Sequence, residues 1–380
     1  MRQNHIKPTT DIESDNAKAS EMTPLFSIGV TTYNRPELLK QTLTTITKQT
    51  FFNFEVIVGN DYIKEPVTAE VLGISDPRIR FVNHAQNLGE VRNNNALIDL
   101  ARGRYFTWQT DDDLYVPNFL EEVHSALVKY NDPPCVFTSF DFIYGSTYPD
   151  IEKTFSVQGQ SFSGRQFLRM YLSSRIKALG CTGVYDKCYL KNIGGVESLA
   201  NTSFVLYSEH LLLIRAGLLE QVAYIDAPLV KYRVHEESWG CATNKDYAIY
   251  KEAGKNLISK SIIVLSNFEL REDFCKNIGS VLKFVVMTLL ERLRAQDRLL
   301  SKLEIVPYLF SLKKQFDSIK GTELYWKAIF SLGLTGVILT WCLVTKSNYK
   351  AFVTQWFVGL ARMLIIPFRR HRGDPVSYDE

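Results

Sequence analysis

Three consecutive aspartates, Asp111, Asp112 and Asp113, are the strongest chemical signal in the sequence. They follow the apolar segment 104–110 and precede Pro117, which opens the next helical pattern. Packing does not require such a cluster, because adjacent carboxylates repel each other and raise one another's pKa values. Carboxylate oxygens are typical ligands of hard cations, so the cluster predicts a Mg²⁺ or Mn²⁺ site with a phosphate as co-ligand. The alternative is a solvated acidic turn that caps the next helix.

Polar residues also end the two apolar segments nearest the N-terminus, VTTYNRP (30–36) and VIVGNDY (56–62). The first offers a nucleotide hydroxyl, ring, amide and cationic groups from Thr31, Tyr33, Asn34 and Arg35. In the second, Asp61 can accept a hydrogen bond from a nucleobase imide or a ribose hydroxyl. Each residue alone is equally well explained as a helix cap or a turn residue. Three polar strand ends in succession favour a ligand site.

Short β-branched and aromatic runs alternate with helix-length segments in this part of the chain. The strand-like runs are 25–33, 54–61, 78–84, 104–110 and 135–144. Asn34 is the expected N-cap of the first helix, and Gly103 is the expected C-cap of a helix over 90–101. The alternation predicts an α/β fold with a mostly parallel sheet covered by helices. Sheets of this kind bind ligands beyond the carboxyl ends of their strands.

The composition is that of a globular protein with a small or neutral partner. Of 380 residues, 46% are hydrophobic and 22% charged, and the mean hydropathy of −0.09 argues against a many-helix membrane protein. The 44 Lys and Arg against 41 Asp and Glu leave a net charge of +3, too balanced for a dedicated nucleic-acid binder. The six cysteines contain no CxxC pair, which excludes a zinc knuckle and favours buried thiols in a reducing compartment. No secretory signal peptide is recognised, so we expect a cytoplasmic protein.

The pattern divides the chain into four parts. Residues 1–23 are polar and aperiodic and are predicted to be a disordered lead-in, before an α/β domain over 24–245. Residues 246–325 show long helical periodicity without strands and predict a helical extension. The last part, 326–380, is predicted to form apolar or amphipathic helices with a basic tail.

Two apolar runs in this last part favour contact with a membrane. Residues 328–345 carry no charge, and 351–368 contain only Arg362 before the basic sequence 369–372. The runs fit a transmembrane span or hairpin, interfacial helices, or helices packed within the protein. We expect association with the cytoplasmic face of a membrane.

The order and spacing of several segments resemble the inverting glycosyltransferases of family 2, which have the GT-A type of nucleotide-diphospho-sugar transferase fold. The resemblance covers about residues 25–240. The segments are SIGVTTYNRPELLKQTLTTITKQT (27–50), FEVIVGNDY (54–62), NLGEVRNNNALIDLARGRYFTWQTDDDLYVPNFLE (87–121), GGVESL (194–199), SEHLLLIRAG (208–217) and VAYIDAPLVKYRVHEES (222–238).

The resemblance implies roles for residues of the nucleotide and metal sites. Asp61 would contact the base, Asp111 the ribose, and Asp112 the metal, with Mg²⁺ or Mn²⁺ as cofactor. Asp113 stays a candidate metal ligand, because the family often has an acid where this chain has Thr110. Arg92 and Asn95 join the nucleotide-sugar-binding set.

The resemblance also implies a catalytic base and a histidine ligand. In SEHLLLIRAG, Glu209 precedes Arg215 by six residues and occupies the place of the family's general base, where aspartate is commoner. The alternative is a helix-start glutamate stabilised by the dipole. His210 is expected to be structural or to face the acceptor. His235 would bind the metal or the pyrophosphate, or be an ordinary loop histidine.

The implied reaction moves a sugar from a nucleoside-diphosphate sugar, with UDP favoured, to an acceptor hydroxyl with inversion. The acceptor would be a glycan or a lipid-linked glycan in polysaccharide or glycolipid assembly, with residues 179–195 lining its cleft and 145–178 forming an insertion or lid. The alternative is a catalytically degenerate member that binds nucleotide or partner proteins at the membrane. A nucleotidyltransferase and a dehydrogenase are disfavoured, because no Gly-rich loop follows the first strand.

Overall fold

A computed structural model describes residues 23–149, 151, 159–200, 202, 204–235, 247–295 and 305–344. Most of the predicted N-terminal lead-in, the second apolar run at 351–368 and the basic residues at 369–372 lie outside these described residues.

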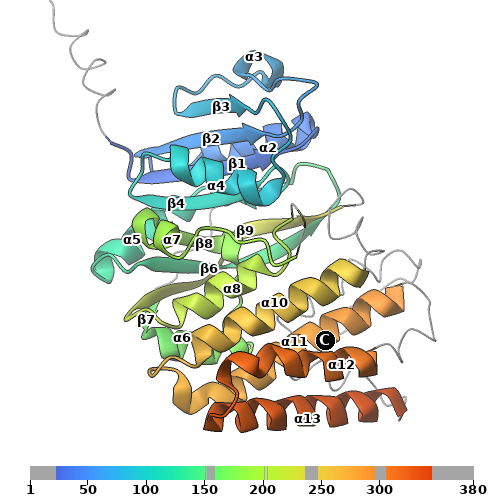
Figure 1. Ribbon diagram of the computed structural model, residues 1–380. Coiled ribbons are helices and arrows are strands. Elements are labelled where there is room, and N and C mark those ends of the chain that lie inside the picture. Colours follow the sequence, from blue (N-terminus) through green and yellow to red (C-terminus); the bar gives the residue numbers. More distant parts are fainter. Residues whose placement is uncertain are drawn as a thin grey trace, which may run out of the picture.

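A mixed sheet of nine strands forms the centre of the described chain, with β3 at its upper edge in Figure 1. Its order is β3-β2-β1-β4-β8-β6-β9-β5, and β7 pairs with β9. The strands are β1 (Phe26–Thr32), β2 (Phe54–Asn60), β3 (Ile79–Asn83), β4 (Tyr105–Thr110), β5 (Leu114–Tyr115), β6 (Cys135–Tyr144), β7 (Gln160–Phe162), β8 (Gly183–Asp186) and β9 (Val222–Val234). Strands β1 to β4 are parallel, as are β6 and β9, whereas β8 runs antiparallel to β4 and β6. The predicted mostly parallel sheet is confirmed.

Helices pack against the sheet, and further helices follow the last strand toward the C-terminus of the chain. They are α2 (Pro36–Thr47), α3 (Ala69–Leu72), α4 (Glu90–Leu100), α5 (Phe119–Lys129), α6 (Gly164–Leu172), α7 (Lys187–Asn192), α8 (Ser208–Ala216), α10 (Tyr247–Leu265), α11 (Phe274–Ala295), α12 (Ile305–Leu312) and α13 (Glu323–Val344), with 3-10 turns η1 (Gly180–Thr182), η2 (Arg271–Asp273) and η4 (Lys313–Ile319). The four residues Leu39, Leu43, Leu97 and Leu120 are fully buried and come from the helices that pack on the sheet, α2, α4 and α5. The stretch 145–178, predicted as an insertion or lid, contains β7 and α6.

Two predicted helix caps are wrong. Arg35, not Asn34, is the N-cap of α2, because Asn34 has a φ of 54° in the left-handed region and forms the turn before the helix. Helix α4 ends at Leu100, and its C-cap Ala101 is already extended, so the chain leaves the helix before Gly103. Gly103 instead packs on β1, where a Cβ would lie 2.7 Å from the backbone nitrogen of Ser27.

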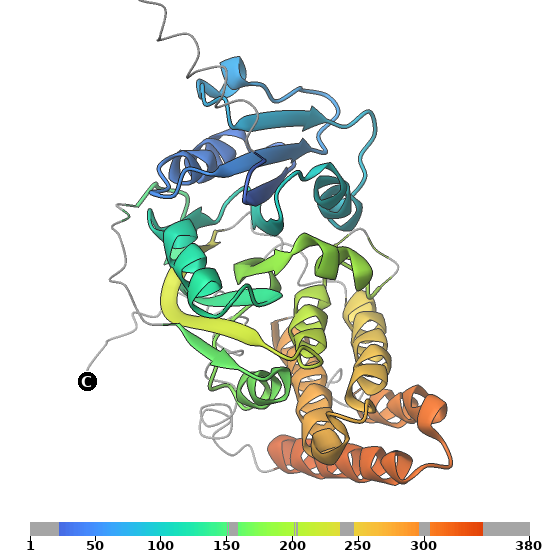
Figure 2. The same cartoon turned by 90° about the vertical axis from the view of Figure 1, so that its left-hand side faces the viewer.

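The C-terminal helices α10 to α13 pack together below the sheet and lie beside α8 and α6 (Figures 1 and 2). Arg169 of α6 pairs with Asp273 of η2, joining the two parts by an ion pair with an N–O distance of 2.6 Å. Along the outside of α13, Trp326, Phe330 and Leu334 are exposed. None of the helices within the described ranges is long and apolar enough to cross a membrane.

Candidate active site

The acid loop, residues 111–113, lies next to the chain that leaves β1. Strands β1 and β4 are parallel neighbours with Thr31 opposite Thr110, so their carboxyl ends meet. The hydroxyl of Thr32 donates to Asp111 Oδ2 at 2.7 Å. Arg35 reaches the same loop, with its Nη2 at 2.8 Å from Asp111 Oδ1 and its Nη1 at 3.1 Å from Asp112 Oδ2. The structure thus brings together three of the predicted site residues, Arg35, Asp111 and Asp112.

The three aspartates of the acid loop differ in their ionisation. Asp111 and Asp113 are at most 1% exposed, and burial raises the pKa of each, with the neighbouring Asp112 charge adding to the effect. Burial opposes ionisation of Asp112 too, but its hydrogen bond with His235 and the charge of Arg35 outweigh that effect and lower its pKa. Asp112 is therefore the firmly charged carboxylate of the loop.

Asp112 and His235 form the pair best suited to hold a divalent cation. His235 Nε2 lies 3.0 Å from Asp112 Oδ2, so an imidazole nitrogen and a carboxylate oxygen lie close enough to bind the same cation. Asp113 is not part of this pair, because its Oδ1 accepts the backbone N–H of Arg233 at 2.7 Å. Among the described residues no three His, Cys, Asp or Glu side chains converge on a metal position. The carboxylate suits Mg²⁺ or Mn²⁺, whereas an imidazole ligand is unusual for Mg²⁺ and favours Mn²⁺; phosphate oxygens and water would supply the other ligands.

Arg233 organises the acid loop, a role that the sequence did not indicate. Its side chain is almost fully buried, and Nε donates to the backbone oxygen of Asp112 at 2.7 Å. The rest of the guanidinium donates to Gln41 Oε1 at 2.8 Å and to the carbonyls of Gly145 and Thr147 at 3.2 and 3.1 Å. Arg233 therefore fixes the acid loop to α2 and to the end of β6.

A second group of predicted residues gathers at the end of β2. Asp61 is buried, and its Oδ1 accepts the backbone N–H of Leu88 at 3.1 Å. The Tyr33 ring is 51% exposed and meets the ring of Tyr62 edge to face, with centroids 5.3 Å apart. Arg92 is exposed and binds the Leu88 carbonyl through Nε at 2.7 Å. Tyr62 was missed by the sequence analysis, although it directly follows Asp61 in the segment that suggested the site.

The structure places three other predicted site residues, Thr31, Asn34 and Asn95, in different surroundings. Thr31 is buried in β1, where alternation points its side chain away from the face used by Thr32. Asn34 is exposed in the turn before α2. Asn95 is engaged by the backbone of Val196, which accepts from its Nδ2 at 2.8 Å and donates to its Oδ1 at 3.0 Å. The structure does not bring Asn95 into the group around Asp61.

Glu209 stands in the first turn of α8, against η1. A Cβ on Gly180 would lie 2.8 Å from Glu209 Cα, so the contact requires a glycine there. Burial raises the pKa of Glu209 to about 7, although the Cys181 thiol and the backbone N–H groups of Gly180 and Cys181 favour the carboxylate. The charge of Glu209 in turn helps to raise the pKa of Asp113. The carboxyl group of Glu209 therefore lies within electrostatic reach of the acid loop.

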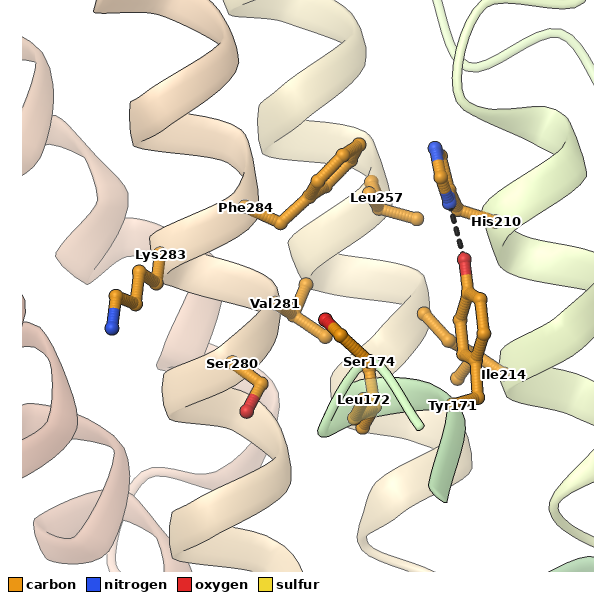
Figure 3. A pocket seen from close by; sticks show the side chains of 10 residues that line it. All are labelled: Tyr171, Leu172, Ser174, His210, Ile214, Leu257, Ser280, Val281, Lys283 and Phe284. Atoms are coloured by element: carbon orange, nitrogen blue, oxygen red, sulfur yellow. Dashed lines mark hydrogen bonds between the residues drawn. The ribbon is translucent and has the colours of Figure 1, made fainter. Parts of the chain in front are cut away.

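His210, the next residue, packs into the interior. Its Nδ1 is hydrogen-bonded to the Tyr171 hydroxyl, and its ring centroid lies 4.2 Å from that of Phe284 in α11 (Figure 3). These three side chains line a cavity of about 30 Å³, the volume of roughly one water molecule. Burial lowers the pKa of His210 to about 3, so the ring is neutral. Of the two predicted roles, the structure supports the structural one.

Glu90 is a further carboxylate near the acid loop and Glu209, and sequence reasoning missed it. It begins α4, and its Oε2 accepts the backbone N–H of Val205 at 3.2 Å, shortly before α8 begins. Burial raises the pKa of Glu90 to about 7, and the charges of Glu209 and Asp112 raise it further. An acidic residue in the first turn of a helix ordinarily interacts with the helix dipole, so the sequence held no signal that separated Glu90 from that role.

The comparisons with known proteins agree with this fold. Residues 27–188 match the model of glycosyl transferase family 2. An uncharacterized glycosyltransferase of Rickettsia bellii is 35% identical over 279 residues, which cover 71% of this chain and 37% of that protein. The UDP-Glc:alpha-D-GlcNAc-diphosphoundecaprenol beta-1,3-glucosyltransferase WfgD of Escherichia coli is 28% identical over 122 residues, 32% of this chain and 45% of that protein.

A crystal structure of S. aureus TarS is similar with a TM-score of 0.52 and 13% identity, over 84% of this chain and 54% of that chain. At that identity the likeness shows the fold alone. The chain spans about a third of the length of its Rickettsia bellii relative, so the match covers only part of that protein. The family expected from the segments is confirmed: the chain belongs to glycosyl transferase family 2 through its α/β domain, which has the GT-A type of fold.

Proposed function

We propose that this chain transfers a sugar from a nucleoside-diphosphate sugar to an acceptor hydroxyl, with inversion at the anomeric carbon. The observation that carries the proposal is the presence of two unlike acidic groups within electrostatic reach of each other. The acid loop holds a firmly charged Asp112, whereas Glu209 has a pKa of about 7. Direct displacement needs a proton acceptor on one side of the sugar and charge stabilisation on the other.

Glu209 would act as the general base. Its carboxylate takes the acceptor hydroxyl's proton while the oxygen attacks the anomeric carbon from the face opposite the diphosphate. A base works best when its pKa lies near the working pH, which the value of about 7 satisfies. The contact with Gly180 and the first turn of α8 fix the position of the carboxyl group. Positioning of this kind supplies much of the rate enhancement in a two-substrate reaction.

The acid loop would receive the diphosphate. Asp112 and His235 are the residues that would hold Mg²⁺ or Mn²⁺, and such a cation neutralises charge on a departing diphosphate. Arg35 adds a permanent positive charge at the same place, because it contacts both Asp111 and Asp112. No protein group is then needed to protonate the leaving group.

The group around Asp61 would bind the nucleobase. Asp61 Oδ1 is occupied by Leu88 N–H, and the second carboxylate oxygen can accept the imide N–H of uracil. Tyr33 and Tyr62 supply aromatic surface beside it. Thymine and guanine also carry an imide N–H, so UDP is favoured among several diphosphates.

A lipid-linked glycan is the proposed acceptor, which would place the chain in polysaccharide or glycolipid assembly at a membrane surface. The name of the Escherichia coli relative gives its acceptor as a diphosphoundecaprenol-linked sugar. The exposed Trp326, Phe330 and Leu334 of α13 form an apolar face suited to an interface. The double variant Trp326→Ser/Phe330→Ser should sediment less with phosphatidylglycerol vesicles than the unmodified chain. Equal sedimentation would count against membrane contact through α13.

Thermal unfolding with UDP, dTDP, GDP and CMP, each with and without Mn²⁺, tests the donor site without knowledge of the acceptor. A ligand present at about 100 times its dissociation constant stabilises the folded chain by about 2.7 kcal/mol. We expect a shift with one diphosphate that requires the cation and that Asp61→Ala reduces. No shift with any of the four would contradict the proposed function and favour a degenerate protein that binds partners.

A further inference from the structure

Glu90 joins two segments that lie far apart in the sequence, the start of α4 and the residues before α8. It starts α4, and through its bond to Val205 N–H it touches the segment that leads into α8 and Glu209. Its carboxyl group senses the charges of Glu209, Asp112 and Arg35, so it lies within electrostatic reach of both the base and the acid loop. Glu90 is only partly buried, which leaves part of the residue accessible to solvent.

The carboxylate of Glu90 has spare capacity to accept hydrogen bonds. A carboxylate has about four acceptor positions on its two oxygens. Glu90 is bonded to one backbone N–H, and none of the ion pairs found in the described part of the chain includes it. A partly buried carboxylate that forms no ion pair either takes up a proton, as the raised pKa of Glu90 indicates, or is stabilised by hydrogen-bond donors such as those of a ligand.

Glu90 lies near both ends of the proposed reaction line, because its Oε2 bonds to Val205 N–H shortly before α8 and the charges of Glu209 and Asp112 both act on it. In an in-line displacement the acceptor oxygen, the anomeric carbon and the leaving oxygen are aligned. Glu209 marks the acceptor end of that line, and Asp112 marks the diphosphate end. The ring of the transferred sugar must lie between the two, and Glu90 interacts with both.

We propose that Glu90 hydrogen-bonds to hydroxyl groups of the transferred sugar and selects neutral, hydroxylated sugars over sugars that carry a carboxylate. This inference rests on the proposed glycosyl transfer and deepens it. Attraction comes from hydroxyl donors meeting a free carboxylate. Rejection comes from like-charge repulsion, which disfavours an anionic sugar such as glucuronate beside Glu90 and Glu209.

The competing explanation is that Glu90 only anchors the segment around Val205. Glu90→Gln separates the two roles, because the Gln oxygen can still accept the Val205 N–H while the negative charge is gone. Glu90→Ala removes both. Asp99→Asn is the matched control, because Asp99 is an exposed acid on the same helix that pairs with Lys191 at the surface.

Calorimetric titration of the full chain with Mn²⁺ and UDP, UDP-glucose, UDP-galactose, UDP-N-acetylglucosamine or UDP-glucuronate tests the proposal. The unmodified chain should bind at least one neutral UDP-sugar more tightly than UDP, and UDP-glucuronate more weakly than that sugar. Hydrogen bonds to a charged group contribute about 1.5–3 kcal/mol, so Glu90→Gln should weaken the preferred UDP-sugar about 10- to 100-fold. Its affinity for UDP should stay within about twofold of the unmodified chain, and discrimination against UDP-glucuronate should shrink. Asp99→Asn should change none of these values.

Two results with the Glu90 variants would overturn the role of Glu90 while leaving the proposed function intact. One is a Glu90→Gln chain that binds all five ligands as the unmodified chain does. The other is a Glu90→Ala chain that loses affinity for UDP and the UDP-sugars by the same factor, because a mere anchor affects every ligand equally. If the unmodified chain binds neither UDP nor any UDP-sugar, the UDP-sugar site itself is refuted. A chain that binds UDP as tightly as every UDP-sugar refutes the contact with the sugar.

Discussion

The acid loop and the pair formed by Glu90 and Glu209 lie within electrostatic reach of each other, and their partners differ. The acid loop is surrounded by cationic or imidazole groups, with Arg35 on Asp111 and Asp112, and His235 on Asp112. Arg233 binds its backbone. Glu90 and Glu209, by contrast, appear in none of the ion pairs between described residues and have only backbone N–H groups or a thiol as partners.

This difference separates a site that holds charge from a site that exchanges protons. Cations and hydrogen bonds keep Asp112 ionised, as its lowered pKa shows. Burial without a cation raises the pKa of Glu209 to about 7, where a carboxylate can take up and release a proton near neutral pH. In the proposed mechanism, the carboxylates of the acid loop and of Glu209 thus perform different chemistry with the same functional group.

Replacing the proposed base should have the largest effect on the comparison. Glu209→Gln keeps the shape of the side chain but removes its ability to accept a proton, so kcat should fall by about 10²- to 10⁴-fold. The affinity for the nucleoside diphosphate should stay unchanged, because the acid loop and Asp61 are intact. Both values follow from steady-state transfer assays and calorimetric titration. Glu220→Gln, at an exposed position just after α8, is the matched control, and unimpaired turnover in Glu209→Gln would remove Glu209 from the mechanism.

Replacing Arg233, whose guanidinium holds the acid loop, should mainly lower the stability of the fold. Arg233→Met fills a similar volume but leaves the buried Asp112 carbonyl and Gln41 without their donor. Breaking a buried charged network by removing one partner typically costs about 3–5 kcal/mol. Urea unfolding measures the loss, and Arg233→Lys should recover part of it, because it keeps the charge but lacks the planar set of donors. A loss below about 1 kcal/mol, the range of a surface pair, would mean that Arg233 does not hold the loop.

The pH dependence of turnover tests Glu209 and Glu90, the two carboxyl groups whose pKa values burial raises to about 7. Glu209 must be deprotonated to accept a proton, and its folded pKa is raised to about 7, so activity should fall as pH drops through 7. Half of Glu209 is deprotonated at pH 7 and about 1% at pH 5, so turnover should fall about 50-fold between these values. Glu90 titrates in the same region, so the profile belongs to the pair, and Glu90→Gln should move its midpoint to lower pH by removing a like charge. A kcat that is constant from pH 5 to pH 8 would contradict this assignment.

The sequence predicted the residues at the carboxyl ends of the parallel strands much better than the residues that reach them from other parts of the chain. Asp61 and Asp111 directly follow strands whose alternating or continuous apolar patterns are recognisable, and parallel strands bring their carboxyl ends together. Once the sheet was predicted, the positions of Arg35 and Asp112 followed from chain order alone. Local patterns and local geometry agree in this half of the fold.

The features that the sequence did not predict depend on contacts between distant segments. Arg233 reaches the acid loop because β9 pairs with both β5 and β6, and no short pattern encodes that pairing. Glu90 meets Val205 across 115 residues of chain. Asn95 shows the converse, since its place in a recognised segment suggested a ligand contact, whereas the fold directs its amide to Val196. Side-chain direction on a helix is decided by what packs against it.

The position of the base should be sensitive to a single added methyl group. Gly180→Ala would put a Cβ 2.8 Å from Glu209 Cα, closer than packed carbon atoms lie, so η1 and α8 must separate. Overpacking of this kind costs about 1–3 kcal/mol, and turnover should fall with it as the carboxyl group moves. Gly333→Ala in α13 is the matched control, because open space surrounds that position and alanine favours helix by about 1 kcal/mol. An active Gly180→Ala chain of full stability would show that this contact does not fix Glu209.

The smallest effect should come from the exposed ion pairs between α6 and η2. Arg169 binds both oxygens of Asp273, at 2.6 and 2.8 Å, but its side chain is 46% exposed, so water and salt screen the interaction. Arg169→Ala should lower the free energy of unfolding by only about 0.2–1 kcal/mol, and by less at high salt. Turnover should not change, because α8 is held against the C-terminal helices by apolar contacts such as that of His210 with Phe284. A loss of kcat in Arg169→Ala, measured beside its urea unfolding, would show instead that the charges between α6 and η2 position Glu209. The contrast between the acid loop and the pair of Glu90 and Glu209 would then depend on residues far from both.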